Sequence, residues 1–391
     1  MTSATEVLYT TLNKLLVYYS LLSYRSDSEL FRKDRCINHK LGITNPSVLR
    51  MIIKYFPSIL KINKLSCEFM PELFKDIQIA QLDLIKKYGY EDKMMRNIWD
   101  NLLKQMIRTL DSISTKYIVV KFLRGAPSLM QDLDIMINDL NIVAKITHLL
   151  RTRGFYEYRP KYLFSNPHKI GLCKENIPFQ IDFYLDCLWR RRRICNIDHL
   201  ISSKIVEKYN DINVPVPRPE YDLYIVGVHG YHNMKITLAE IMQGIYILDA
   251  YSKKFDPVLL WEVSKVYNTI DASYFYLKSI KEFIKFATKI LRIDISRIEE
   301  NLDPILDIFE EKYLICRKIR SYLESLYLKA YKKYIVFPVK VPLSIFRILT
   351  PFNFVKGIVL GKSINKNVPL EFLSYYVTLH RDIIFKLRQV S

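Results

Sequence analysis

Two aspartates, Asp132 and Asp134, stand one residue apart in the otherwise apolar segment Asp132–Ile137. Side chains alternate between the two faces of a strand, so we expect both carboxylates on one face, with Leu133 and Ile135 on the other. Burying an unpaired carboxylate is costly. A shared divalent cation would offset that cost, since Mg²⁺ is commonly held by one or two carboxylates together with substrate phosphates. These residues therefore predict an enzyme that handles phosphates.

A second acidic strand is expected further along the chain. The segments Lys169–Lys174 and Phe179–Asp186 both alternate apolar and polar residues, and the short polar loop between them predicts a β-hairpin. In the second strand Asp182 and Asp186 share a face. Either acid is a candidate partner for the first two aspartates.

The elements that must position these acids form a short series. An apolar strand at Tyr117–Leu123 precedes the turn Arg124–Ser128, and a helix at Asp139–Gly154 follows the acidic strand. The order strand, turn, strand, helix and hairpin predicts an α+β fold with a small mixed or antiparallel sheet.

Helical periodicity dominates both sides of this core. We expect an N-terminal helical domain at 1–110, a catalytic core at 111–213 and a C-terminal helical domain at 214–391, which opens with an extended proline-rich linker from Val214. The clearest expected helices are Val7–Leu22, Pro46–Lys61, Pro71–Tyr88, Asp92–Ser112, Leu259–Tyr267, Ala272–Ile293 and Asp303–Tyr334.

Composition narrows the class of protein. The chain has 391 residues and a formal net charge of +19, which favours anionic partners such as nucleotides or nucleic acid. Six scattered cysteines without metal-binding spacing predict reduced thiols, and with no signal peptide in view we expect a cytoplasmic protein. Prolines and charges interrupt the apolar segment Tyr334–Gly361, so we expect no transmembrane segment there.

These pieces together resemble the nucleotidyltransferase superfamily typified by DNA polymerase β and kanamycin nucleotidyltransferase. The pattern is similar above all to uncharacterised prokaryotic nucleotidyltransferase family proteins. The matching segments cover roughly residues 105–255, and they are Val119–Ser128, Asp132–Asp134, His168–Leu172, Gln180–Asp182 and Pro219–His232.

The resemblance implies specific roles. Asp132, Asp134 and Asp182 would be the catalytic residues and would hold Mg²⁺ or Mn²⁺, and Asp182 is preferred to Asp186 because Gln-Ile-Asp-Phe matches the family's strand. The resemblance also implies binding of a nucleoside triphosphate (NTP), whose phosphates would contact five residues. These are Lys121, Arg124, Gly125, Ser128 and Lys169, of which Arg124 is preferred because it lies in the turn.

The implied activity is transfer of a nucleoside monophosphate (NMP) from the NTP to a hydroxyl, with release of pyrophosphate. The acceptor stays open: a small molecule, a protein or an RNA end such as tRNA. The basic run Arg190, Arg191, Arg192 and Arg193 is a candidate contact for nucleic acid, and a solvated basic loop is about equally favoured.

Two other interpretations stay open. Pro127 has no N–H to offer a phosphate, which favours a catalytically degenerate fold acting as a nucleic-acid-binding or toxin/defence module. A helical scaffold or membrane-surface adaptor that uses Tyr334–Gly361 is the other.

Overall fold

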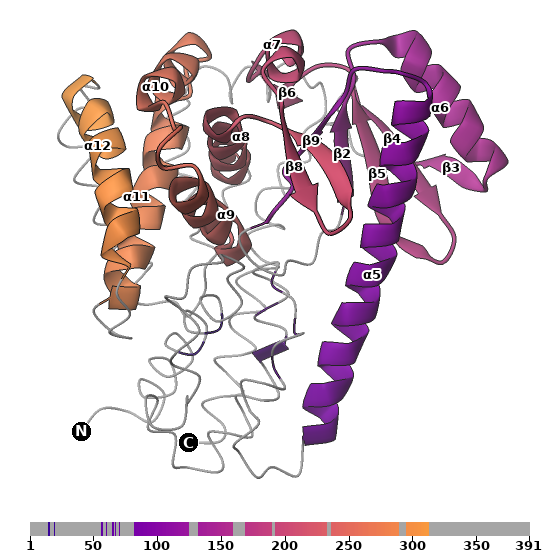
Figure 1. Cartoon of the computed structure of the whole chain (residues 1–391), viewed down its shortest axis with the longest axis horizontal. Helices are drawn as coiled ribbons and strands as arrows, with labels where there is room; N and C mark the ends of the chain where they lie inside the picture. Colours follow the sequence, from indigo (N-terminus) through magenta and orange to yellow (C-terminus); the bar gives the residue numbers. More distant parts are fainter. Residues whose placement is uncertain are drawn as a thin grey trace, which may run out of the picture.

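The structure is a computed structural model. It describes residues 82–124, 132–158, 169–189, 192–232, 236–288 and 295–312, together with single positions at 15, 19, 56, 57, 60, 65, 67 and 70. Most of the helices expected before residue 82, and the segment Tyr334–Gly361, lie outside the described residues. Figure 1 shows the described elements, with α5 and α6 beside the main sheet and the later helices grouped on its other side.

The centre of the fold is a five-stranded mixed sheet with the order β1-β2-β5-β4-β3. Strands β2 and β5 run parallel, and the other neighbours are antiparallel. The strands are β1 (Ile118–Val120), β2 (Asp132–Met136), β3 (Phe155–Tyr158), β4 (Lys169–Lys174) and β5 (Ile177–Tyr184). The expected acidic strand and hairpin are therefore confirmed, and the fold is α+β. Strand β3, which continues the sheet beyond β4, was not expected from the sequence.

The two faces of this sheet belong to different hydrophobic clusters. Leu133 and Ile135 on β2 and Phe183 on β5 pack in one cluster with side chains of α5 and α6. Met136 and Tyr184, whose side chains point to the opposite face, pack in a second cluster with the C-terminal helices. The alternation expected for Asp132–Ile137 is thus present. The acidic face of the sheet lies toward the C-terminal helices, opposite α5 and α6.

Two helices cover the apolar face of the sheet. Helix α5 (Leu82–Ser112) carries Trp99, Leu103 and Leu110 into the same cluster as the strands, so it runs across the domain boundary expected at residue 110. Helix α6 (Leu140–Thr152) begins where the Asp139 side chain accepts hydrogen bonds from two backbone N–H groups. It ends just before Gly154, whose φ of 85° suits a residue without a Cβ atom.

The segment expected as a proline-rich linker forms a strand instead. Strands β8 (Ile205–Tyr209) and β9 (Ile212–Val216) make an antiparallel hairpin, and Pro215 lies opposite Val206. The domain boundary expected at residue 213 therefore falls inside β9. Val214 and Val216 are buried against the sheet cluster, which explains why this stretch is extended yet packed.

The C-terminal helices pack around α8, which contacts α9, α10 and α11. The helices that follow the five-stranded sheet in the chain are α7 (Ile197–Ser202), α8 (Pro219–His232), α9 (Leu238–Ala250), α10 (Pro257–Val266), α11 (Ile270–Phe286) and α12 (Ser296–Lys312). A capping box between Thr237 and Glu240 starts α9. Among the described residues, none of the helices is both long and apolar enough to cross a membrane.

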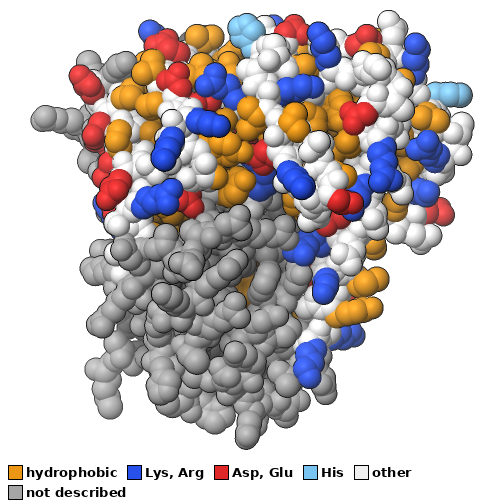
Figure 2. Space-filling model, in the orientation of Figure 1, with side chains coloured by type: hydrophobic (Ala, Val, Ile, Leu, Met, Phe, Trp, Pro, Cys, Tyr) orange, Lys and Arg blue, Asp and Glu red, His pale blue; other side chains and the backbone are white. Residues whose placement is uncertain are grey.

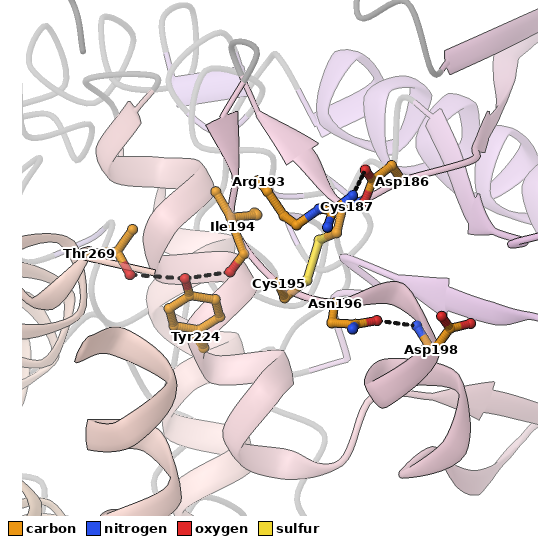
Figure 3. The surroundings of a disulfide bond; sticks show 9 residues. All are labelled: Asp186, Cys187, Arg193, Ile194, Cys195, Asn196, Asp198, Tyr224 and Thr269. Carbon is orange, nitrogen blue, oxygen red and sulfur yellow. Dashed lines mark hydrogen bonds and ion pairs between the residues drawn. A yellow bond between two sulfur atoms is a disulfide. The ribbon is translucent and has the colours of Figure 1, made fainter. Parts of the chain in front are cut away.

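Two cysteines that we expected to be reduced form a disulfide. Cys187 precedes β6 (Leu188–Trp189) and Cys195 follows β7 (Arg192–Arg193), so the β6–β7 hairpin brings them together with Cα atoms 5.5 Å apart. Figure 3 shows the Asp186–Arg193 ion pair on one side of the bond and the Tyr224 hydroxyl, which donates to the Ile194 carbonyl, on the other. The expectation of reduced thiols was wrong for this pair, because sequence spacing does not show the strand pairing.

Removing this disulfide should lower the free energy of unfolding by about 2–3 kcal/mol, the loop entropy expected for a closure of 8 residues. Urea unfolding of the double variant Cys187→Ala/Cys195→Ala measures the loss. Cys173→Ala, which removes a free and partly exposed thiol, is the matched control. A double variant as stable as that control would contradict the prediction.

Candidate active site

Asp134 and Asp182 stand side by side in the sheet. They are Cα partners in the parallel register between β2 and β5, so their side chains leave the sheet on the same face. Both carboxylates are buried, with relative exposures of 5% for Asp134 and 0% for Asp182. Neighbouring strands are about 4.8 Å apart, and two buried carboxylates at this spacing repel each other unless positive charge lies between or beside them.

Two lysines supply positive charge to the pair. Lys121 Nζ lies 2.9 Å from Asp134 Oδ2, and Lys169 Nζ contacts Asp182 Oδ2. Both ammonium groups also lie over the ring of Tyr184, at 5.5 Å and 5.6 Å from its centroid. The structure therefore brings four of the predicted site residues into one cluster around Tyr184. They are Asp134, Asp182, Lys121 and Lys169.

The two carboxyls respond differently to this environment. Burial raises the pKa of Asp182 to about 6, and the negative charge of Asp134 adds to the shift while Lys169 opposes it. Burial also acts to raise the pKa of Asp134, but Lys121, Lys169 and the Tyr184 hydroxyl together outweigh it and hold this pKa below its ordinary value. The pair thus combines a carboxyl whose pKa is lowered with one whose pKa is raised to about 6, a combination suited to acid–base work.

Asp132 begins the same strand on the same face. Its Cα partner on β5 is Gln180, and its charge contributes to raising the pKa of Asp182 and of Tyr184. Even so, in the described part of the chain no group of three His, Cys, Asp or Glu side chains is arranged closely enough to hold a metal ion. All three predicted aspartates lie on one face of the sheet, and Asp134 and Asp182 are adjacent. The three do not, however, form a group close enough to hold a metal ion.

By the type of their ligand atoms alone, the carboxylates suit a hard divalent cation. Asp134 Oδ1 is buried and has no hydrogen-bond partner within the described residues. Carboxylate oxygen is the ligand that Mg²⁺ prefers, and Asp134 Oδ1 is a buried acceptor to which no described residue donates a hydrogen bond. The lysine ammonium groups bear the positive charge that the pair requires here.

Comparison with known proteins does not place the chain in a family. No family model matches it, and no curated protein matches it. The likeness to nucleotidyltransferases therefore rests on residues of the sequence alone.

Arg124, the preferred phosphate ligand, lies in a different cluster. Its guanidinium is only 6% exposed and forms ion pairs with Glu207 on β8 and Asp222 on α8. Its backbone N–H donates to the Gln243 side chain, whose amide in turn donates to Asp222 Oδ2 at 2.8 Å. In this structure the charge of Arg124 is used to join the sheet to the helices.

The remaining predicted residues are only partly described. Gly125 and Ser128 lie outside the described residues, as do Arg190 and Arg191. Arg192 and Arg193 form β7. The exposed Arg193 side chain pairs with Asp186. On the face drawn in Figure 2, Lys and Arg side chains are spread among acidic ones.

The buried cluster around Arg124 predicts a pH-dependent stability. Burial raises the pKa of Asp222 from 3.8 to about 6, against the attraction of Arg124 and the Gln243 hydrogen bond, and Glu207 adds to the rise. Between pH 4 and pH 6 the folded state holds a proton that the unfolded state has lost. The free energy of unfolding should therefore fall as pH rises through this window and level off above it.

Urea unfolding at several pH values between 4 and 7 measures this slope. The variant Asp222→Asn keeps the shape of the side chain and lacks the ionisation, so the difference between wild type and variant isolates Asp222. The groups that act on Asp222 include Arg124, Glu207 and Gln243, and Tyr246 lies close to Arg124. Identical slopes for the two proteins would contradict the assignment.

Proposed function

We propose that the chain is a metal-dependent nucleotidyltransferase that moves an NMP from an NTP to a hydroxyl acceptor and releases pyrophosphate. One observation carries the proposal: Asp134 and Asp182 are register partners on parallel neighbouring strands, buried on one face with Asp132 at the start of β2. A paired acidic face on a mixed sheet is the arrangement that the resemblance implies for metal-assisted transfer.

Each residue of the cluster has a role in the proposal. Asp134 and Asp182, with Asp132 as a further ligand, would hold the divalent cation, which when bound supplies positive charge to the triphosphate and to the attacking hydroxyl. The Asp182 carboxylate would accept the proton of the acceptor hydroxyl. The acceptor oxygen then bonds to the α-phosphorus, and the bond to the bridging oxygen breaks, so that pyrophosphate leaves with the electron pair.

Lys121 and Lys169 would change partners during binding. Both ammonium groups are partly exposed, at 17% and 28% for their side chains, while the carboxylates they contact are almost fully buried. A cation that takes over the carboxylates would release the two lysines toward phosphate oxygens. They would then stabilise the charge that develops on the leaving pyrophosphate.

The test is incorporation of label from α-³²P-labelled NTPs in the presence of Mg²⁺ or Mn²⁺, with RNA, protein and small-molecule fractions offered as acceptors. Wild type should transfer label, and Asp134→Asn should not. Asp211→Asn is the matched control, because it makes the same chemical change at an exposed carboxylate. Asp211 lies in the turn of the β8–β9 hairpin and pairs with Lys104 of α5. Equal labelling by Asp134→Asn and wild type would contradict the proposal.

The Lys–Asp pairs also favour a second candidate, a degenerate fold that binds nucleic acid without catalysis. Here Lys121 and Lys169 already neutralise the carboxylates, so the cluster is electrostatically satisfied without a metal. The same experiment separates the candidates. No transfer by wild type, together with RNA binding that weakens steeply with salt, would favour the degenerate fold.

A further inference from the structure

A glycine and a glutamine lie beside the pair Asp134 and Asp182, and neither has a role in the proposed reaction. Gly171 on β4 is the Cα partner of Asp182, and Gln180 lies two residues before Asp182 on the same face of β5. The side-chain amide of Gln180 donates a hydrogen bond to Asp182 Oδ1. Asp182 is therefore held at Oδ1 by Gln180 and at Oδ2 by Lys169.

Gly171 provides the space for this hydrogen bond. A Cβ atom at residue 171 would lie 2.5 Å from Gln180 Nε2 and 3.2 Å from Asp182 Oδ1. The first distance is shorter than real Cβ contacts allow, so any side chain at 171 would displace the Gln180 amide. Backbone conformation does not explain the glycine, since among the described glycines the one with positive φ is Gly154. A glycine inside a strand often marks such a close approach.

We propose that Gly171 and Gln180 are positioning residues that set the orientation of the Asp182 carboxylate; the inference rests on the proposed function. A carboxylate rotates about its Cβ–Cγ bond, and a donor on Oδ1 restricts that rotation. Because the Gln180 amide is neutral, it orients Asp182 without cancelling the negative charge that a cation needs. Its hydrogen bond also persists when Lys169 turns to a phosphate.

Partners that orient a metal ligand typically change metal affinity or activity by about 10–100-fold when they are removed. Gly171→Ala and Gln180→Leu should each weaken Mn²⁺ binding by about that factor. Gly171→Ala should keep the fold, because the atom it displaces is the far end of a flexible side chain. The double variant should bind Mn²⁺ no more weakly than the single variant with the larger loss, since both substitutions act through one hydrogen bond.

Two measurements on the full chain test this. Electron paramagnetic resonance of free Mn²⁺ gives the affinity of wild type, the two single variants and the double variant. Nuclear magnetic resonance of the Gln180 side-chain amide, assigned by its loss in Gln180→Leu, reports the hydrogen bond without metal or activity. We expect this signal to shift in Gly171→Ala and in Asp182→Ala, and to stay in place in the control Asp211→Asn.

The outcomes separate the two proposals. A Gln180 signal that does not move in Gly171→Ala would overturn the inference, whatever the enzyme activity. So would single variants that bind Mn²⁺ as wild type does, or a double variant whose loss is the product of the single losses. A wild type that binds no Mn²⁺ and transfers no label would contradict the proposed function instead, while the resonance experiment still decides whether Gly171 and Gln180 orient Asp182.

Discussion

Asp182→Asn is expected to lower the rate of nucleotidyl transfer by about 10²–10⁴-fold, the range that a positioned general base contributes. Asparagine keeps the size of the side chain and an oxygen that can accept the Gln180 hydrogen bond. It lacks the charge to hold a cation and the basicity to accept the acceptor's proton. The loss should appear in kcat/KM, because the same carboxylate both holds the cation that acts on the triphosphate and accepts the acceptor's proton.

Steady-state kinetics of pyrophosphate release measures this effect, with thermal unfolding recorded for each protein. The matched comparison is Asp186→Asn. Asp186 is the other acid considered from the sequence, and it lies two residues after the end of β5. Asp186 accepts from the Cys187 backbone N–H and pairs with the exposed Arg193. Loss of activity in Asp186→Asn but not in Asp182→Asn would exchange the roles assigned to the two acids.

Arg124→Met is expected to lower the free energy of unfolding by about 3–5 kcal/mol, because removing one partner of a buried ion pair leaves charge without compensation. Glu207 and Asp222 would then face each other inside the protein, with side-chain exposures of 11% and 2%. Methionine keeps an unbranched apolar stem but is shorter than arginine, so the loss combines the missing charge with the space left by the guanidinium.

Urea unfolding measures this loss, and two further variants make the result specific. Arg151→Met removes a guanidinium from an exposed pair with Glu157 and should change stability little. The double variant Arg124→Met/Asp222→Asn should recover part of the loss, since one of the two stranded carboxylates is gone. If Arg124→Met were as stable as Arg151→Met, the buried cluster would not join the sheet to the helices.

Local pattern was enough to predict the acidic strand, the hairpin and helix α6. Each depends on periodicity within one segment: the alternation in Asp132–Ile137 and in Phe179–Asp186, and the helical repeat in Asp139–Gly154. The shared face of Asp132 and Asp134 follows from the same period of two. These features need no knowledge of the rest of the chain.

Features that depend on distant partners were not predictable in this way. The sequence shows that Asp134 and Asp182 lie on strands, but not that the strands are parallel neighbours in exact register. Arg124 was assigned to phosphate because it lies in the turn. Its partners Asp222 and Gln243 come 98 and 119 residues later, so the local sequence does not show them. Similarly, the pairing of Cys187 with Cys195 depends on the β6–β7 hairpin, which has no strong sequence signal.

The most direct test of the acidic pair is a crystal structure of the protein with Mn²⁺ and a non-hydrolysable NTP, with Mn²⁺ located by anomalous scattering. The predicted result is a peak within coordination distance of oxygens from both Asp134 and Asp182, with Lys121 and Lys169 turned toward the phosphates. A structure that holds the nucleotide elsewhere, with both lysines still paired to the aspartates and no metal peak between the two strands, would contradict it.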